Sequence, residues 1–248
     1  MNASACADTD RLLESLAQAL AGLDPALIAA QYREQGELVV IERFLPPDVL
    51  EALLGALPAL APAVTRNYLP GHKQGGSVSR FALDRLAPVF GQLYRSEPLL
   101  AWMRGLSDRP ELQHCPPRDP HTYALYYYTR PGDHIGWHFD TSYYHGQRYT
   151  LLLGLVDRSS CKLECVQWKG DPARERTRSV TLSPGTLVFF NGDRCWHRVT
   201  PAQAGEERVA LTFEYVTDPR MPAWRRFVSD MKDALGYFGF RQVFLGRN

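Results

Sequence analysis

The chain has 248 residues, of which 45% are hydrophobic, and its 28 Lys and Arg nearly balance its 27 Asp and Glu. This length is ample for one domain with a sizeable core. The near-zero net charge removes the main reason to expect nucleic acid or an anionic membrane as a partner. The longest apolar runs, such as 151–156, are far shorter than the roughly 20 residues that span a bilayer. The first residues lack the pattern of a signal peptide, and five cysteines without a CxxC pair disfavour a disulfide framework. We therefore expect a soluble, cytoplasmic protein.

The first third of the sequence is typical of helices. Leucines recur at helical spacing from Leu12 to Leu23, after N-cap candidates at 8–10. The pair Asp24-Pro25 ends this helix or starts a second one through Tyr32. A β-rich segment, an Ala/Leu helix, a Gly-rich mobile loop and a broken helix are then predicted in this order, at 37–45, 46–62, 67–79 and 87–106.

From His121 onward the pattern changes to short strands separated by turn residues. Strands are predicted at 122–129, 147–156, 161–168, 178–182, 186–190 and 207–217. Such spacing without intervening helices indicates an antiparallel sandwich or barrel. The segment 222–235 again has helical periodicity.

We predict a single domain whose fold class is mainly β with flanking helices. Residues 1–120 form a mainly helical support, 121–217 form the β-barrel-like core, and 218–248 form a C-terminal helix and tail.

Three potential metal ligands lie within the predicted core. His138 and Asp140 belong to the motif Trp-His-Phe-Asp, and His197 follows at a distance. Residues i and i+2 of a strand point to the same face, so His138 and Asp140 can present an imidazole and a carboxylate to one ion. Two histidines and one carboxylate that leave coordination positions open are typical of non-heme Fe(II) oxygenases. The alternative for His138 taken alone is a hydrogen-bonded histidine beside a surface aspartate.

The surrounding sequence resembles the iron(II)/2-oxoglutarate-dependent dioxygenases, in particular their compact prolyl-hydroxylase-like branch. The resemblance covers roughly 123–216, and the order and spacing of its motifs match throughout. The matching motifs are at 128–140, 148–153, 183–190, 197–201 and 205–212.

This resemblance implies a double-stranded β-helix (jelly-roll) core that the N-terminal helices support. It also implies Fe(II) as cofactor, 2-oxoglutarate and O2 as co-substrates, and ascorbate as a stimulant. The implied metal ligands, which are also the catalytic residues, are His138, Asp140 and His197. Oxidation of an aliphatic C–H bond would be coupled to decarboxylation of 2-oxoglutarate to succinate.

The resemblance also assigns residues to 2-oxoglutarate. Arg208 matches the arginine that pairs with the distal carboxylate, for which the guanidinium fork is suited. Tyr128 matches a tyrosine whose hydroxyl reaches the same carboxylate, and Thr150 is expected to add a third hydrogen bond. The family's usual serine two residues after the arginine is Ala210 here, and Thr212 is a candidate replacement.

Parts of the chain, notably 140–150 and 159–164, are similar to stand-alone lysine halogenases and their hydroxylase relatives. In the halogenases a small residue replaces the metal-binding carboxylate and leaves a position for chloride. Because Asp140 supplies the carboxylate here, we expect oxygenation.

The leading hypothesis is hydroxylation of a small free amino acid or a similar metabolite, with Arg80 and His134 as candidate substrate contacts. For Arg80 the alternative is a surface arginine, and for His134 it is a turn histidine. A hydroxylase of a protein or peptide side chain is the second hypothesis. A jelly-roll module that binds metal without turnover is the third, and the presence of Arg208 argues against it.

Overall fold

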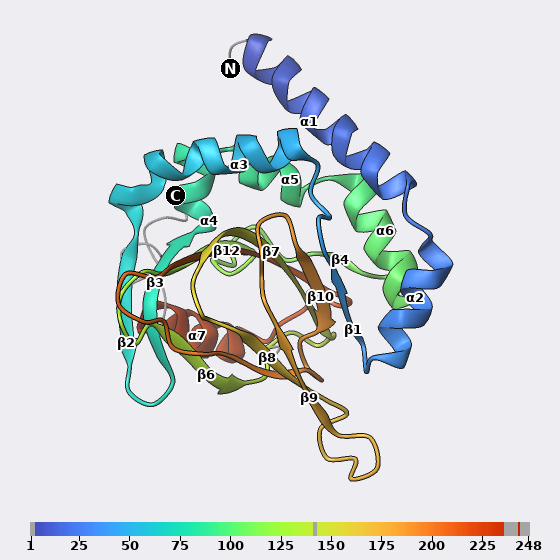
Figure 1. The fold of residues 1–248 in the computed structure, drawn as a ribbon, viewed down its shortest axis with the longest axis vertical. Helices are drawn as coiled ribbons and strands as arrows, with labels where there is room; N and C mark the ends of the chain where they lie inside the picture. The colour runs from blue at the N-terminus through green and yellow to red at the C-terminus, as the bar shows by residue number, and fades with distance from the viewer. Residues whose placement is uncertain (1–2, 141–142, 236–242, 244–248) are drawn as a thin grey trace.

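The computed structural model describes residues 3–140, 143–235 and 243. Helices α1 to α6 lie along the upper and right-hand sides of a strongly curved β-sheet in Figure 1, and α7 lies apart from them. The helices are α1 Ala3–Ala21, α2 Pro25–Glu34, α3 Pro47–Leu60, the 3₁₀ helix η1 Ala61–Ala63, α4 Arg80–Leu86, α5 Val89–Tyr94, α6 Glu97–Ser107 and α7 Ala223–Asp233.

The described strands form one curved sheet in which all pairings are antiparallel. Its order is β1-β10-β7-β12-β5-β3-β6-β11-β8-β9, with β2 paired to β3 and β4 paired to β12. The strands are β1 Leu38–Ile41, β2 Thr65–Leu69, β3 Lys73–Ser79, β4 Gln113–His114, β5 Tyr123–Tyr128, β6 His134–His138, β7 Arg148–Arg158, β8 Leu163–Gln167, β9 Arg176–Val180, β10 Leu187–Asn191, β11 Trp196–Val199 and β12 Glu207–Val216.

Strand β12 shows how the sheet separates two environments. Successive side chains of a strand point to opposite faces. From Val209 to Tyr215 the odd-numbered residues belong to the large apolar core that includes the helices. The even-numbered residues from Arg208 to Glu214 line a cavity on the concave side of the sheet. The curvature of the sheet thus creates an interior that can hold a site.

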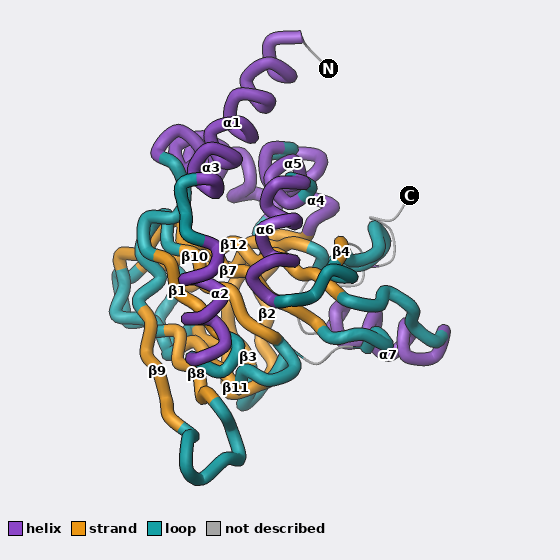
Figure 2. The backbone as a smooth tube through the Cα atoms, turned by 90° about the vertical axis from the view of Figure 1, so that its right-hand side faces the viewer, coloured by secondary structure: helices purple, strands orange, loops and turns teal. Residues whose placement is uncertain are grey.

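The helices cover the convex side of the sheet, where they bury its apolar residues. Leu16 of α1, Leu53 of α3 and Met103 of α6 are fully buried in the same core as Leu151 and Phe189 of the sheet. Figure 2 shows α1 to α6 grouped around one part of the sheet and α7 apart from them. The predicted role of the N-terminal helices as a support is therefore consistent with their packing.

The helix boundaries follow from local capping. The Asp24 carboxylate accepts hydrogen bonds from the backbone N–H groups of Ala26 and Leu27, at 3.0 and 3.1 Å, so that Pro25 starts α2. The Ser96 hydroxyl accepts a hydrogen bond from Leu99 N and starts α6. The break at Asp24-Pro25 was predicted from these residues, and the separation of α5 from α6 agrees with the broken helix predicted at 87–106.

The segment 67–79 is not the mobile loop that the sequence predicted. It forms most of the hairpin β2–β3, and β3 lies inside the sheet between β5 and β6. A Cβ atom on Gly76 would lie 2.7 Å from Val64 Cγ1 and 3.1 Å from Tyr127 Cβ. Glycine is required there because two neighbouring side chains approach the backbone closely, whereas Gly71, at φ +72°, forms the turn.

The remaining elements agree with the jelly-roll prediction. All six strands predicted between His121 and Thr217 are present, and the sheet has the double-stranded β-helix architecture. Helix α7 confirms the helix predicted at 222–235. The tail predicted beyond it, apart from residue 243, lies outside the described residues. The division into 1–120, 121–217 and 218–248 stays a prediction.

Among the described helices, no single one is both long and apolar enough to cross a membrane. Asp8–Ala21 and Pro25–Glu34 meet that criterion only together, across a bend of 74°.

Candidate metal centre

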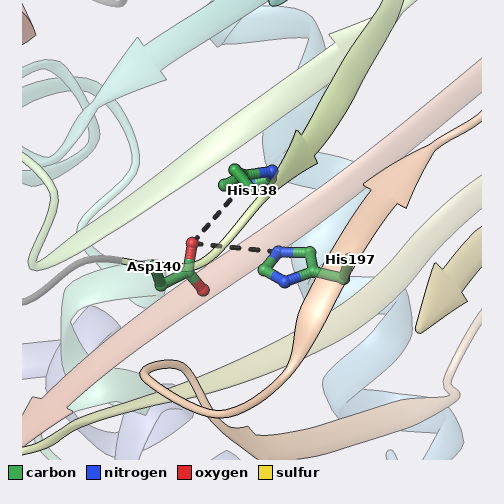
Figure 3. A group of neighbouring side chains, drawn as sticks. All are labelled: His138, Asp140 and His197. Atoms are coloured by element: carbon green, nitrogen blue, oxygen red, sulfur yellow. Dashed lines mark ion pairs between the residues drawn. The ribbon is translucent and has the colours of Figure 1, made fainter. Parts of the chain in front are cut away.

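Three candidate metal ligands come together at one end of the concave face. His138 ends β6, His197 lies directly opposite it in β11, and Asp140 follows β6 by two residues. Each of the three offers one ligand atom, and these atoms all lie within 4.8 Å of one another. Asp140 Oδ1 is 3.4 Å from His138 Nε2 and 3.8 Å from His197 Nε2 (Figure 3). The three side chains therefore converge on a volume the size of one ion.

Asp140 reaches this position differently from the prediction. Because β6 ends at His138, Asp140 is not presented by strand pleating. Its backbone N–H donates to the Gly192 carbonyl at 3.0 Å, which ties it to the turn between β10 and β11. A Cβ on Gly192 would lie only 2.8 Å from the Asp140 Cβ, so a glycine in the turn permits this approach.

Backbone carbonyls orient both imidazoles. His138 Nδ1 is 2.8 Å from the Gly136 carbonyl oxygen, and His197 Nδ1 is 3.0 Å from the Cys195 carbonyl oxygen. A carbonyl can only accept, so each Nδ1 carries the proton and donates. The Nε2 lone pairs are left for the space beside Asp140. Metal-binding histidines are typically held in this manner.

The protonation states also suit a metal. Burial lowers the pKa of His197 to about 4, so this imidazole is neutral at neutral pH. Burial alone would raise the pKa of Asp140. The two imidazoles and a hydrogen bond from Thr150 outweigh this effect and hold the pKa well below its usual value. Asp140 is therefore a carboxylate at neutral pH, and neither residue must lose a proton before it binds a cation.

The hydroxyl of Thr150 lies between two carboxylates. Its Oγ1 is 2.6 Å from Asp140 Oδ2 and 3.0 Å from Glu214 Oε2. One hydroxyl proton can be donated to only one of these oxygens at a time. Thr150 was predicted to bind 2-oxoglutarate, whereas these contacts place it directly behind a candidate metal ligand.

Arg208 is almost completely buried, with 1% of its surface exposed. It is the cross-strand partner of Tyr128, and its guanidinium carbon lies 5.0 Å from the centre of that ring. Its Nε and Nη1 have no hydrogen-bond partner among the described residues. Burial raises the pKa of Tyr128 to about 12, an effect that the Arg208 charge opposes. A buried guanidinium without a carboxylate partner is costly, so this position suits an anionic ligand.

One cavity connects these residues. Its volume is about 80 Å³, several times the roughly 10–15 Å³ that one water molecule needs. The three candidate ligands, Arg208 and Tyr128 all line it. Further polar residues complete the lining: His121, Tyr143, Arg148, Thr150, Thr212, Glu214 and Ser229. The Thr212 hydroxyl is buried without a hydrogen-bond partner among the described residues. It is thus available for the bond that the family's usual serine would make.

The two predicted substrate contacts do not line this cavity. Arg80 begins α4, pairs with Asp84 at 2.9 Å and donates to the Pro117 carbonyl. His134 Nδ1 is 2.7 Å from the Gly132 carbonyl oxygen, which agrees with the alternative of a turn histidine. Both side chains have local partners, although Arg80 Nε has none among the described residues, and their role as substrate contacts stays a prediction.

The sequence analysis missed Arg148 and Glu214. Arg148 Nε lies 3.1 Å from Glu214 Oε2, and its Nη2 lies 4.0 Å from Asp119 Oδ2. Burial raises the pKa of Glu214 well above its usual value, although Arg148 opposes this shift. The alternation of side chains along a strand could have identified Glu214, because this residue shares the inward face of β12 with Arg208.

Comparisons with known proteins agree with this geometry. Residues 122–215 match the family model of the 2OG-Fe(II) oxygenase superfamily. No curated protein sequence matches the chain.

Several solved structures share the fold. The epimerase SnoN from nogalamycin biosynthesis, in complex with Fe3+, alpha ketoglutarate and nogalamycin RO, is 17% identical with a TM-score of 0.63, over 78% of this chain and 84% of that one. A Pseudomonas putida prolyl-4-hydroxylase is 19% identical with a TM-score of 0.55, and the match covers 79% of this chain and 100% of that one. A Trichoplax adhaerens prolyl hydroxylase, in complex with a peptide fragment of hypoxia inducible factor, is 16% identical with a TM-score of 0.59. This match covers 92% of this chain and 97% of that one.

The matched segment contains the three candidate ligands and Arg208, and its fold is the one that these structures share. Residues 122–215 are thus similar to the 2OG-Fe(II) oxygenase superfamily, both in their match to the family model and in their fold.

Proposed function

We propose that the protein hydroxylates an aliphatic C–H bond of a small free amino acid or a similar metabolite. The observation that carries this proposal is the polar, charged lining of the cavity beside the candidate metal ligands. The match of residues 122–215 to the 2OG-Fe(II) oxygenase superfamily supports Fe(II) as cofactor and 2-oxoglutarate as co-substrate, and bound iron would supply the activation of O2. Succinate is the expected co-product.

His138, Asp140 and His197 would hold the iron. The neutral imidazoles, oriented through Nδ1, and the ionised carboxylate are a donor set that suits Fe(II) and leaves coordination positions open. Asp140 thus fills the position that a small residue would open to chloride, which favours hydroxylation over halogenation.

Arg208 would bind the distal carboxylate of 2-oxoglutarate. Its Nε and Nη1 lack partners among the described residues, and a carboxylate can pair with the guanidinium in a bidentate manner through Nη2 together with either of these nitrogens. Tyr128 would support the same carboxylate from the neighbouring strand, and Thr212 is placed to add a hydrogen bond. The role predicted for Thr150 at 2-oxoglutarate stays a prediction, because its contacts favour an action on Asp140.

A small substrate is favoured over a peptide because the charged residues beside the candidate ligands are buried. Arg148 and Glu214 have side chains that are only 11% and 8% exposed. Groups with so little access to solvent suit a ligand that the cavity encloses. A peptide side chain is the second candidate, and the fold shared with prolyl hydroxylases supports it.

The first test supplies iron-loaded protein with 2-oxoglutarate, O2, ascorbate and each free proteinogenic amino acid in turn. We expect at least one amino acid to stimulate succinate formation and to gain the mass of one oxygen atom. Mass spectrometry would read both products in the same sample. Peptides run in parallel are the control for the second candidate, and stimulation by peptides alone would contradict the proposal of a free amino acid.

The second prediction concerns Arg208. The change Arg208→Met should weaken 2-oxoglutarate binding by about 30-fold or more, because a buried charge partner worth roughly 2–5 kcal/mol is lost. Anaerobic calorimetric titration of the Mn(II)-loaded protein would measure the change. Arg158→Met is a matched control, since Arg158 is exposed on β7 and its ion pair among the described residues is with Glu207. Equal affinities of Arg208→Met and the unaltered protein would remove Arg208 from the co-substrate site.

The third prediction concerns Thr150 as a positioning residue for Asp140. Thr150→Val removes the hydroxyl 2.6 Å from Asp140 Oδ2 and should weaken Co(II) binding by about 10–100-fold. Thr150→Ser should restore the affinity because it restores the hydroxyl. Thr212→Val is the control, as Thr212 also lines the cavity but has no such contact with a candidate ligand. Unchanged Co(II) affinity in folded Thr150→Val protein would show that the contact does not position Asp140.

A further inference from the structure

A buried ion pair in the cavity wall has no part in the proposed binding of iron or 2-oxoglutarate. Arg148 begins β7 and Glu214 lies near the end of β12, two strands that run side by side. Both residues line the same cavity as the candidate metal ligands. The burial of two charges is unfavourable unless they are well paired and hydrogen-bonded.

The pairing of these two residues is incomplete. Glu214 approaches the guanidinium at Nε, and Asp119 is 4.0 Å from Nη2, so neither carboxylate forms a bidentate fork with Arg148. Despite the 3.1 Å contact, Arg148 Nε has no aligned hydrogen bond among the described residues. The hydrogen-bonding capacity of Arg148 is therefore not used fully within the protein.

The position of the pair is suited to a substrate. Glu214 shares the Thr150 hydroxyl with Asp140, so a ligand that contacts Glu214 lies next to the candidate metal site. Arg208 lies on the same face of β12 as Glu214. At a rise of roughly 3.3 Å per residue, the Cα atoms of these two residues are about 20 Å apart along the strand. The wall near Arg148 is thus remote from the place proposed for the distal carboxylate of 2-oxoglutarate.

The charges in the cavity indicate what kind of substrate fits. Arg148 and Glu214 offer one cationic and one anionic group on the same wall of the cavity. A substrate with only one charged group would leave one member of the pair buried without a charge partner once the two separate. A zwitterion adds no net charge, and its two charged groups match those of the pair.

We propose that Arg148 and Glu214 anchor a zwitterionic substrate, with Arg148 binding its α-carboxylate and Glu214 binding its α-ammonium group. This assignment rests on the proposed function and names the residues that select a free amino acid. Separation of the pair by the ligand replaces one incomplete contact with two complete ones. A guanidinium binds a carboxylate best through two parallel hydrogen bonds, which the substrate would supply.

The test uses the amino acid that best stimulates succinate formation and two analogues of it. The α-carboxamide lacks the negative charge, and the deamino acid lacks the positive charge. For the unaltered protein, kcat/KM should fall by about 100-fold or more with either analogue, because a buried polar group is left unpaired. The variants are Arg148→Gln, Glu214→Gln and the double variant. The double variant removes both charges, so that neither is left buried without its partner.

In Arg148→Gln the discrimination against the carboxamide should fall to within about threefold, while discrimination against the deamino acid persists. Glu214→Gln should show the reverse pattern, and the double variant should lose both preferences. Titration of 2-oxoglutarate into each variant should give unchanged affinity, which separates loss of substrate recognition from collapse of the site.

The outcomes separate the two proposals. If an amino acid is hydroxylated but the variants keep both preferences, the anchoring role is wrong and the proposed function stands. If no amino acid stimulates succinate formation in the unaltered protein, both proposals are overturned. If the single variants fail to fold, the double variant decides: retention of both preferences overturns the anchoring role, and their loss supports it.

Discussion

The antiparallel pairing of β6 with β11 is the constraint on which the candidate site depends. It sets His138 opposite His197, two residues that are far apart in the sequence. The carbonyls of Gly136 and Cys195 then orient the imidazoles, and the turn at Gly192 brings Asp140 to them. Backbone geometry therefore assembles the donor set before any metal binds.

The inward face of β12 extends this arrangement through the cavity. Arg208 and Glu214 lie on the same face of one strand, yet they differ in their partners. Arg208 has unused donors and suits an anionic co-substrate, whereas Glu214 is linked to Asp140 through Thr150 and to Arg148 directly. One strand thus connects the proposed 2-oxoglutarate site, the candidate metal centre and the wall proposed to recognise the substrate.

The three candidate metal ligands and Arg208 were predictable as members of one site because their residue types and spacing repeat a known pattern. The place of Asp140 was not, since a turn between two distant strands sets it. The hairpin at 67–79 was missed because glycine serves equally in mobile loops and in closely packed strands. Glu214 lies outside the matching motifs and the motif that begins at Arg148 gives this arginine no role, so only the register of β7 and β12 shows that the two residues meet.

The most direct test of the central claim is an anaerobic titration of the apoprotein with Fe(II), followed by 2-oxoglutarate. The account predicts one Fe(II) per chain and a visible charge-transfer band when 2-oxoglutarate binds to it. His197→Ala, which removes one of the three ligands, should lose the tight Fe(II) site and the band. Tight Fe(II) binding and an unchanged band in that variant would contradict the assignment of the metal centre.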